Sequence, residues 1–388
     1  MVCGGATATA QAVEGKAEVG GGVGAEGQEL AHEAILASQH NGRIFSEPMT
    51  LRTKVALGLL VFVPISIAAE SLGMGEGVVF VTSALAILPL AVWLSTATEE
   101  LALTLGPSIG ALLNAVFGNA TELIIALVAL RAGLVEIVKA SITGTVVANL
   151  LLALGLSMLL GGIGRQEQRF QPVVARVNGT AMSLAVLAIL IPSLTGMGDG
   201  GHGLGTQRFS TFVAWVLLLV YGLTLLFSLR THSGLYAVAE ADLAEGTEVS
   251  HPNDAVHKPR LLPWLAVLVA ATLGVAYESE LFVGVVEEVT AKVGLSALFT
   301  GVVLLPLLGG VAEYLTAVTM ARKNKMDLSV SVALGSTLLV ALLVVPILVL
   351  VGPLVGHPLD LNFQIYELVA IATAVVVSNL VSLDGRSD

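Results

Sequence analysis

Two glutamates lie at matched positions inside long apolar stretches of the sequence. Glu122 is followed by Ile124 and Ile125, and Glu313 is followed by Leu315. A charged side chain at the centre of a bilayer costs about 2.5–3.5 kcal/mol on insertion scales, and such residues usually serve transport or proton transfer. If these stretches cross a membrane, the pair indicates a functional site. The alternative is that each glutamate is protonated and hydrogen-bonded to a neighbouring helix.

The residues around both glutamates offer the oxygen atoms that a hard cation needs. Ca²⁺ takes roughly six to eight oxygen ligands, which carboxylates, carbonyls, hydroxyls and waters can supply together. Gly118 precedes Glu122, and Gly309 and Gly310 precede Glu313, so helices can approach closely there or release backbone carbonyls. Small polar residues in membranes also serve ordinary interhelical hydrogen bonds. The nearby candidates for metal ligands are Asn119, Thr121, Thr145 and Ser336.

Protons are expected to compete with a cation for these carboxyl groups. Burial and mutual repulsion favour the protonated form of two neighbouring carboxyl groups when no metal is bound. A site that crosses the membrane either loaded with metal or protonated would perform antiport, with the proton gradient driving the metal uphill. Glu99 and Glu100, near the cytoplasmic end of their stretch, could pass protons to the site, or they could be solvated interfacial charges.

The composition predicts that the elements carrying these residues cross a bilayer. Of 388 residues, 55% are hydrophobic and 12% are charged, and about 20 consecutive apolar residues suffice to span a membrane. We therefore predict an all-α integral membrane protein with about ten transmembrane helices. The predicted spans are 55–69, 78–96, 109–130, 137–160, 177–194, 209–229, 261–277, 295–321, 328–351 and 363–383.

The remaining segments divide the chain into five parts. We expect a disordered tail at 1–50, a first transmembrane helix at 51–72, one half of a transporter at 73–230, an acidic cytoplasmic linker at 231–260 and a second half at 261–388. Four outer glutamates beyond the span at 261–277 are expected to be solvated: Glu278, Glu280, Glu287 and Glu288.

Basic residues predict the orientation of the spans, because short cytoplasmic loops keep an excess of Lys and Arg. With the N-terminus inside, only Arg131, Lys139, Arg208 and Lys292 of the 18 basic residues fall outside. A missed span would have mixed the two groups. The net charge of −11 excludes a basic nucleic-acid-binding surface, and the single Cys3 excludes a disulfide framework.

An internal repeat relates the two glutamates. Glycine, glutamate and arginine residues recur in the second half at a constant shift of 191 residues, and Thr145 then matches Ser336. The repeated segments are five predicted spans apart, so one copy is inverted, as in many transporters that bind substrate between repeats. The second half has one predicted helix fewer than the first. The matched pairs are Gly118 with Gly309, Glu122 with Glu313, Arg131 with Arg322 and Gly144 with Gly335.

These motifs resemble the calcium/proton exchanger (CAX) family. The likeness rests on GNATELIIALVALRAG, on VVANLLLALGLSMLLGG and on VAEYLTAVTMARKNKMDLSVSVALGS, and it extends over residues 50 to 388. The resemblance implies a regulatory first helix, two inverted five-helix halves joined by an acidic helix, and export of Ca²⁺ from the cytosol against protons. It implies metal ligation by Glu122 and Glu313, neighbouring polar roles for Asn119, Thr145 and Ser336, and proton coupling through Glu99.

The family also implies a location and shows where this sequence departs from it. We expect an inner-membrane protein if the source is bacterial and a vacuolar one if it is eukaryotic, with self-association left open. The family usually has Asn at Gly310, His at Tyr314 and Gln at Leu339, so the second half has lost polar groups. These losses favour weaker calcium binding or another cation, and the final helix of the family is expected to be missing.

Other functions fit the sequence less well. A primary pump needs a nucleotide site, and no GxxxxGK[ST] motif occurs. A membrane metalloenzyme would need His ligands for zinc, but all seven His residues fall in the tail or in loops. We therefore expect no enzymatic activity and no cofactor beyond the transported cation and protons. An antiporter of Mn²⁺, Na⁺ or K⁺ and a cation channel remain alternatives.

Overall fold

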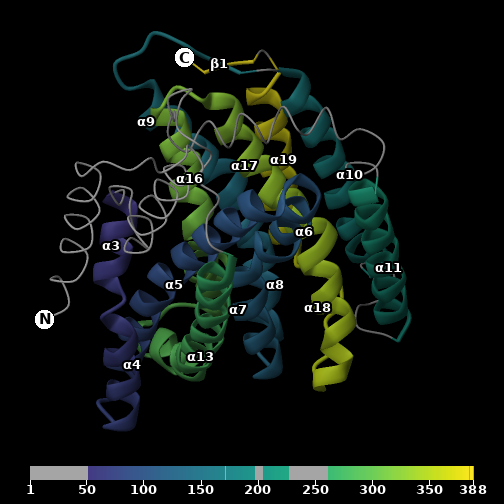
Figure 1. Cartoon of the computed structure of the whole chain (residues 1–388). Coiled ribbons are helices and arrows are strands. Elements are labelled where there is room, and N and C mark those ends of the chain that lie inside the picture. The colour runs from purple at the N-terminus through teal and green to yellow at the C-terminus, as the bar shows by residue number, and fades with distance from the viewer. Residues whose placement is uncertain (1–50, 171, 197–203, 227–260, 384, 388) are drawn as a thin grey trace, which may run out of the picture. The chain divides into compact units, whose positions relative to one another are not determined.

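The apolar runs of the sequence form helices, which satisfy their backbone groups internally, as the interior of a bilayer requires. The structure, a computed structural model, describes residues 51–170, 172–196, 204–226, 261–383 and 385–387. The predicted tail at 1–50 and the predicted linker at 231–260 lie outside the described residues. Figure 1 traces the helices, which from Thr53 onward belong to one compact unit.

The helices follow the order of the predicted spans, and several spans consist of two or more consecutive helices. The first half contains α3 (Leu51–Leu59), α4 (Phe62–Ser71), α5 (Glu76–Leu105), α6 (Pro107–Phe117), α7 (Ala120–Arg131), α8 (Val135–Val147), the π-helix η1 (Ala148–Ala153), α9 (Leu154–Gly162), α10 (Pro172–Gly196) and α11 (Leu204–Leu226). The second half contains α13 (Leu261–Val293), α14 (Ala297–Phe299), the π-helix η3 (Thr300–Leu304), α15 (Leu305–Gly309), α16 (Val311–Arg322), α17 (Met326–Leu339), the π-helix η4 (Val340–Val344), α18 (Val345–Val351), the 3-10 helix η5 (Gly352–Val355) and α19 (Ile365–Val381).

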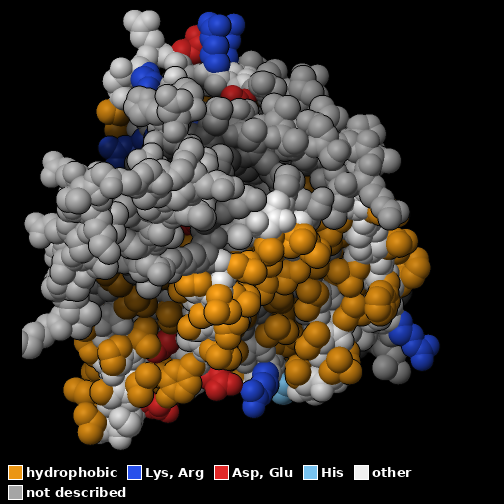
Figure 2. Space-filling model, viewed as in Figure 1, with side chains coloured by type: hydrophobic (Ala, Val, Ile, Leu, Met, Phe, Trp, Pro, Cys, Tyr) orange, Lys and Arg blue, Asp and Glu red, His pale blue; other side chains and the backbone are white. Residues whose placement is uncertain are grey.

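The described helices confirm an all-α membrane fold. Among the described residues, seven helical segments are long and apolar enough to cross a membrane, or eight if the bent pair Ala297–Gly309 and Val311–Arg322 counts as one span. Shorter apolar helices occur at Asn178–Leu194 and Ile365–Val381. Figure 2 shows a broad apolar surface with charged side chains at its margin, which suits contact with lipid. The number of crossings stays a prediction.

The helix boundaries support the internal repeat. The shift of 191 residues carries the interruption before α7 onto the interruption before α16, and it carries η1 onto η4 to within one residue. The same shift carries α10 onto α19. Since π-helices are rare and usually functional, their recurrence at equivalent positions supports a duplication of the fold. The inversion of the second copy stays a prediction.

Contacts between distant segments agree with the predicted orientation. Arg165 donates to the Arg322 carbonyl at 2.9 Å, and Gln168 donates to the Ala321 carbonyl at 2.8 Å. The two-residue strands β1 (Gln168–Arg169) and β2 (Arg386–Ser387) pair antiparallel at the same end. All of these segments were assigned to the inside by their basic residues. On the outside, Lys292 pairs with Glu76 at 2.8 Å.

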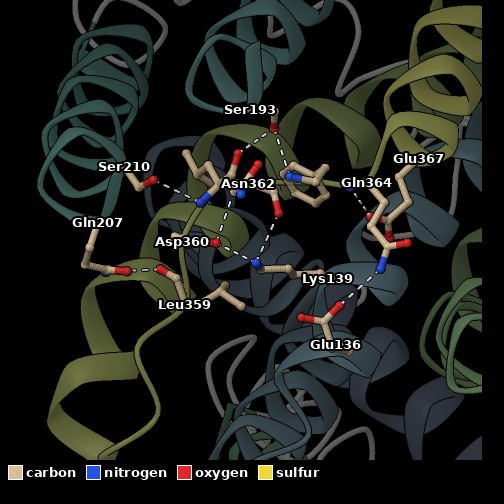
Figure 3. Close-up of polar contacts among 12 residues, drawn as sticks. Glu136, Lys139, Ser193, Gln207, Ser210, Leu359, Asp360, Asn362, Gln364 and Glu367 are labelled. Carbon is tan, nitrogen blue, oxygen red and sulfur yellow. Dashed lines mark hydrogen bonds and ion pairs between the residues drawn. The ribbon is translucent and has the colours of Figure 1, made fainter. Parts of the chain in front are cut away.

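The segment 356–364, named the outer loop, is not helical, and its central residues Leu359, Leu361 and Phe363 are buried. Leu359 and Leu361 are fully buried, and buried backbone groups outside regular structure need other hydrogen-bond partners. Side chains of α10 and α11 supply these partners (Figure 3). The bonds are Ser193 Oγ to the Leu361 carbonyl (2.6 Å), the Leu361 N–H to Ser210 Oγ (2.9 Å) and Gln207 Nε2 to the Leu359 carbonyl (3.2 Å).

An ion pair connects the outer loop to α8. Lys139 Nζ lies 2.5 Å from Asp360 Oδ1 and donates to the Asn362 carbonyl at 3.1 Å (Figure 3). The Lys139 side chain is 7% exposed and that of Asp360 is 17% exposed. Removing one partner from a buried pair leaves the other charge uncompensated, which is more costly than removing both.

We expect Lys139→Met to lower the free energy of unfolding by about 3 kcal/mol, because it leaves Asp360 without its cation. Thermal unfolding of the purified protein in detergent is the measurement. The double variant Lys139→Met/Asp360→Asn carries neither charge and should recover most of the loss. If the double variant is no more stable than Lys139→Met, the ion pair does not hold the loop.

The prediction that Glu278 is solvated is wrong. The helix predicted to end at Tyr277 continues to Val293 as α13, and Glu278 is fully buried. The Ser66 hydroxyl oxygen of α4 lies 2.7 Å from each carboxylate oxygen of Glu278 and donates its hydrogen to them. The reason is the packing of α4 against α13, which covers this side of the helix. Glu280 remains exposed, as predicted, and pairs with Arg131 at 3.2 Å.

Candidate functional site

The helices that carry the two glutamates begin at interruptions within the predicted spans. Glu122 lies in the first turn of α7, after Gly118 and Asn119, and Glu313 lies in the first turn of α16, after Gly310. At the second interruption the axis bends by 62°. A helix amino end favours negative charge, and each interruption leaves carbonyls of the preceding turn without helical partners. Carboxylates and backbone oxygens therefore meet at both interruptions.

Glu122 is a buried carboxyl group without a protein partner for its oxygens. It is 9% exposed, and neither Oε1 nor Oε2 has a hydrogen-bond partner among the described residues. Gly309 of the other half lies directly against it, since a Cβ on Gly309 would come within 2.8 Å of Glu122 Cγ. A buried carboxylate without compensation is strongly unfavourable, so a cation or a proton must neutralise Glu122.

Glu313 lies on α16 and is half-buried. The next residue, Tyr314, is buried, and its ring lies against Gly310 at the interruption. The contact between Gly309 and Glu122 brings the two halves of the repeat to one place.

A buried hydrogen-bond cluster joins the first interruption to α17. Asn119 Nδ2 donates to Ser336 Oγ at 2.8 Å, and Asn149 Nδ2 donates to the same oxygen at 3.0 Å. Both amides turn their N–H groups to Ser336, so their carbonyl oxygens face elsewhere. Asn149 Oδ1 is buried and has no hydrogen-bond partner among the described residues. The cluster can therefore present neutral oxygens to a cation.

The sequence reasoning did not single out Asn149. The signal was present, because an amide within the apolar run VVANLLLALG is as unusual as the glutamates. Asn149 is 1% exposed and is the second residue of the π-helical part of the span. It has no polar counterpart in the second half, where the shift of 191 residues leads to Val340. Asn149 therefore could not be identified from polar residues that recur in both halves of the repeat.

The other predicted site residues have mixed positions. Thr121 lies on α7, beside Glu122, and Thr145 lies on the next helix, α8. Each is 5% exposed, so both are buried. Glu99 is exposed on α5 and accepts a hydrogen bond from Ser95 at 3.0 Å. Glu100 is half-buried on the same helix. The structure thus places Glu99 outside the buried part of the site.

The helices that follow the two glutamate helices, α8 and α17, are packed differently at equivalent glycines. A Cβ on Gly144 of α8 would lie 2.2 Å from the Val302 carbonyl oxygen and 2.7 Å from Pro306 Cγ, so η3 and α15 press directly on α8. Gly335 of α17, the repeat partner of Gly144, has no heavy atom within 4 Å of such a Cβ among the described residues. The outer half of α8 is therefore tightly covered, and the equivalent part of α17 is not.

The arrangement can bind a hard cation with oxygen ligands. Within the described part of the chain, no group of three or more His, Cys, Asp or Glu side chains gathers as in a closed metal site. The polar side chains at the first interruption and on α17 that the structure brings together are neutral: Asn119, Asn149 and Ser336. Oxygen donors of this kind suit Ca²⁺, Mg²⁺ and Mn²⁺, and they can exchange the ion more readily than a closed structural site.

Comparisons with known proteins identify the family of the chain. The family model described as sodium/calcium exchanger protein matches residues 76–230 and 263–388. A protein of Aphanothece halophytica named Ca(2+)/H(+) antiporter is 50% identical over 345 residues, which cover 88% of this chain and 92% of that protein. Vacuolar cation/proton exchanger 3 of Arabidopsis thaliana is 38% identical, over 88% of this chain and 76% of its own length.

A solved structure is also similar to this chain. The structure of native YfkE is 34% identical to this chain, with a TM-score of 0.72, over 85% of this chain and 92% of the YfkE chain. The residues matched by the family model, 76–230 and 263–388, include both interrupted spans.

Proposed function

Because the chain belongs to the sodium/calcium exchanger protein family, we propose that it is a secondary active antiporter that exports Ca²⁺ from the cytosol in exchange for protons. It is a multi-pass membrane protein. The names of its relatives favour the inner membrane of a bacterium or a vacuolar membrane as its location. Both locations allow a proton gradient to drive export from the cytosol.

One observation carries the proposal: both oxygens of the buried Glu122 lack a hydrogen-bond partner among the described residues. Such a group accepts either a cation or a proton, and it is unfavourable when it holds neither. Glu313, Asn119 and Thr145 are the further residues that we assign to the cation, and Ser336 orients the Asn119 and Asn149 amides beside it. The cation and the proton compete for the same carboxyl groups. Their movements are therefore coupled, because the site crosses the membrane in one direction with the cation and in the other with protons.

The unequal packing of α8 and α17 supports alternating access. The outer half of α8 is covered by η3 and α15, which in this proposal closes the outer path, and Gly335 marks looser packing on the inner side. In the other end state, the packing of the two halves would be exchanged, as expected for repeats of opposite orientation. Proton transfer through Glu100, which is half-buried, is part of this proposal.

An imposed pH gradient, acid inside, should drive Ca²⁺ uptake into inside-out vesicles that contain the purified protein. The same vesicles should be tested with Mn²⁺, Na⁺ and K⁺, with internal pH followed by a fluorescent dye. Uptake of Ca²⁺ together with proton release is the expected result. Ion current without proton movement would instead show that the protein is a channel. Proton-coupled uptake of Na⁺ or K⁺, without uptake of Ca²⁺, would show that the substrate is that cation and not Ca²⁺.

A further inference from the structure

The two interruptions differ at the residue that precedes the glutamate helix. Asn119 occupies this position in the first half and Gly310 occupies it in the second, at the same point of the repeat. The Asn119 side chain crosses to Ser336 in the other half. Gly310 has no side chain, so it cannot donate a hydrogen bond to Thr145, the repeat partner of Ser336, as Asn119 does to Ser336. One amide is therefore missing from the site.

Tyr314 occupies the space that a side chain at position 310 would need. A Cβ on Gly310 would lie 2.6 Å from both Cζ and Oη of Tyr314, a distance that no real pair of atoms of this kind adopts. Tyr314 is 8% exposed, so its ring is held in place by its surroundings. The repeat partner of Tyr314 is Leu123, which cannot form a hydrogen bond. Residues 310 and 314 therefore have to change together.

The Tyr314 hydroxyl group also binds an oxygen of the interruption. It donates to the Pro306 carbonyl at 3.0 Å, and the same carbonyl accepts the Gly310 N–H at 2.9 Å. A carbonyl oxygen has two lone pairs, so both are occupied. The lone pair of the Pro306 carbonyl that the helical hydrogen bond leaves free for a cation is thus occupied by Tyr314.

We propose that Tyr314, seated on Gly310, is a specificity-determining residue of the cation site. It replaces an amide by a phenol ring and withdraws the Pro306 carbonyl from the ligand set. Ca²⁺ favours a high number of oxygen ligands, whereas ions that accept fewer ligands, such as Mn²⁺, lose less. The pair therefore shifts the preference of the site from Ca²⁺ toward Mn²⁺. This inference rests on the proposed cation transport and refines its substrate.

The first arm of the test makes the second half resemble the first. Gly310→Asn alone should reduce cation binding at least tenfold, because the new side chain overlaps the Tyr314 ring. Gly310→Asn/Tyr314→Leu removes the overlap and should restore binding. It should also raise the ratio of Ca²⁺ affinity to Mn²⁺ affinity about fivefold over the unmodified protein, a change of about 1 kcal/mol at 1.4 kcal/mol per tenfold.

The second arm removes only the hydroxyl group. Tyr314→Phe keeps the ring on Gly310 and frees one lone pair of the Pro306 carbonyl, so it should move the affinity ratio in the same direction by a smaller amount. Affinities for Ca²⁺ and Mn²⁺ are measured by titration calorimetry on the purified protein, independently of transport. Thermal unfolding of each variant identifies one that has failed to fold.

Two results would overturn the proposal. One is a double variant that binds as poorly as Gly310→Asn although it is folded, since the two positions would then be independent. The other is a Ca²⁺ to Mn²⁺ ratio that stays constant in both Tyr314→Phe and the double variant. Failure of the proposed function is a separate observation, namely absence of proton-driven uptake of any cation by the unmodified protein in vesicles.

Discussion

Replacing Glu122 by glutamine should abolish proton-driven Ca²⁺ uptake while leaving the fold intact. Glutamine has the shape of the protonated glutamate, so it keeps the packing against Gly309 but cannot give up a proton or supply a charged ligand. We expect uptake to fall about 100-fold or more, equivalent to about 2.8 kcal/mol at 1.4 kcal/mol per tenfold. Uptake into vesicles under an imposed pH gradient is the measurement, and Glu313→Gln should give the same result.

Thermal unfolding separates a lost site from a lost fold. Because a ligand that binds only the native state raises the unfolding temperature, Ca²⁺ should stabilise the unmodified protein and leave Glu122→Gln unaffected. Glu287→Gln is the matched control, since Glu287 is an exposed glutamate of α13. This control should keep its uptake and its response to Ca²⁺. Substantial uptake by Glu122→Gln would show that Glu122 does not bind the transported cation.

The second large effect is expected at Gly144. A methyl group there would lie 2.2 Å from the Val302 carbonyl oxygen and 2.6 Å from Val302 Cα, both of which belong to the backbone. Backbone atoms cannot turn away as a flexible side chain can, so Gly144→Ala must separate α8 from η3. We expect transport to fall at least tenfold, about 1.4 kcal/mol, because the outer side can no longer close. The measurement is uptake into vesicles.

The repeat supplies the matched control for this prediction. Gly335→Ala places a methyl group where no heavy atom lies within 4 Å among the described residues, so it should retain most of the uptake. A thiol probe then tests opening directly. Cys3 is the only cysteine of the chain, and Ser141 is a buried residue of α8 three positions before Gly144. Cys3→Ser/Ser141→Cys should therefore resist a membrane-impermeant reagent added outside and become reactive when Gly144→Ala is added. Equal transport in both glycine variants would contradict the assigned closure.

The features that could be predicted from the sequence were those for which a single residue type in an apolar run, or at its ends, is informative without knowledge of contacts. Glu122 and Glu313 stand out because a carboxylate in an apolar run is costly, and the shift of 191 residues relates them without any structure. The orientation followed from basic residues alone. The contacts of β1 with β2, and of Lys292 with Glu76, agree with it.

The features that were not predicted depend on which segments meet in space. Hydropathy indicated an unbroken span at 295–321, whereas the structure bends it by 62° at Gly310. Glu278 was predicted to be solvated because nothing near it in sequence reveals that Ser66 lies opposite. The loss of polar groups at Gly310 and Tyr314 was visible in the sequence. That the two residues occupy one space could be recognised only from the geometry.

The outer loop has a consequence for biosynthesis. A ribosome that makes this chain releases Lys139 about two hundred residues before Asp360, and N-terminal segments usually fold first. Throughout that interval the first half carries a basic side chain near the membrane boundary whose acidic partner does not yet exist. Its helices can insert, but α8 gains its ion pair with the outer loop only after Asp360 has been synthesised. Completion of the second half is thus required before α8 has all the contacts that it makes in the folded protein.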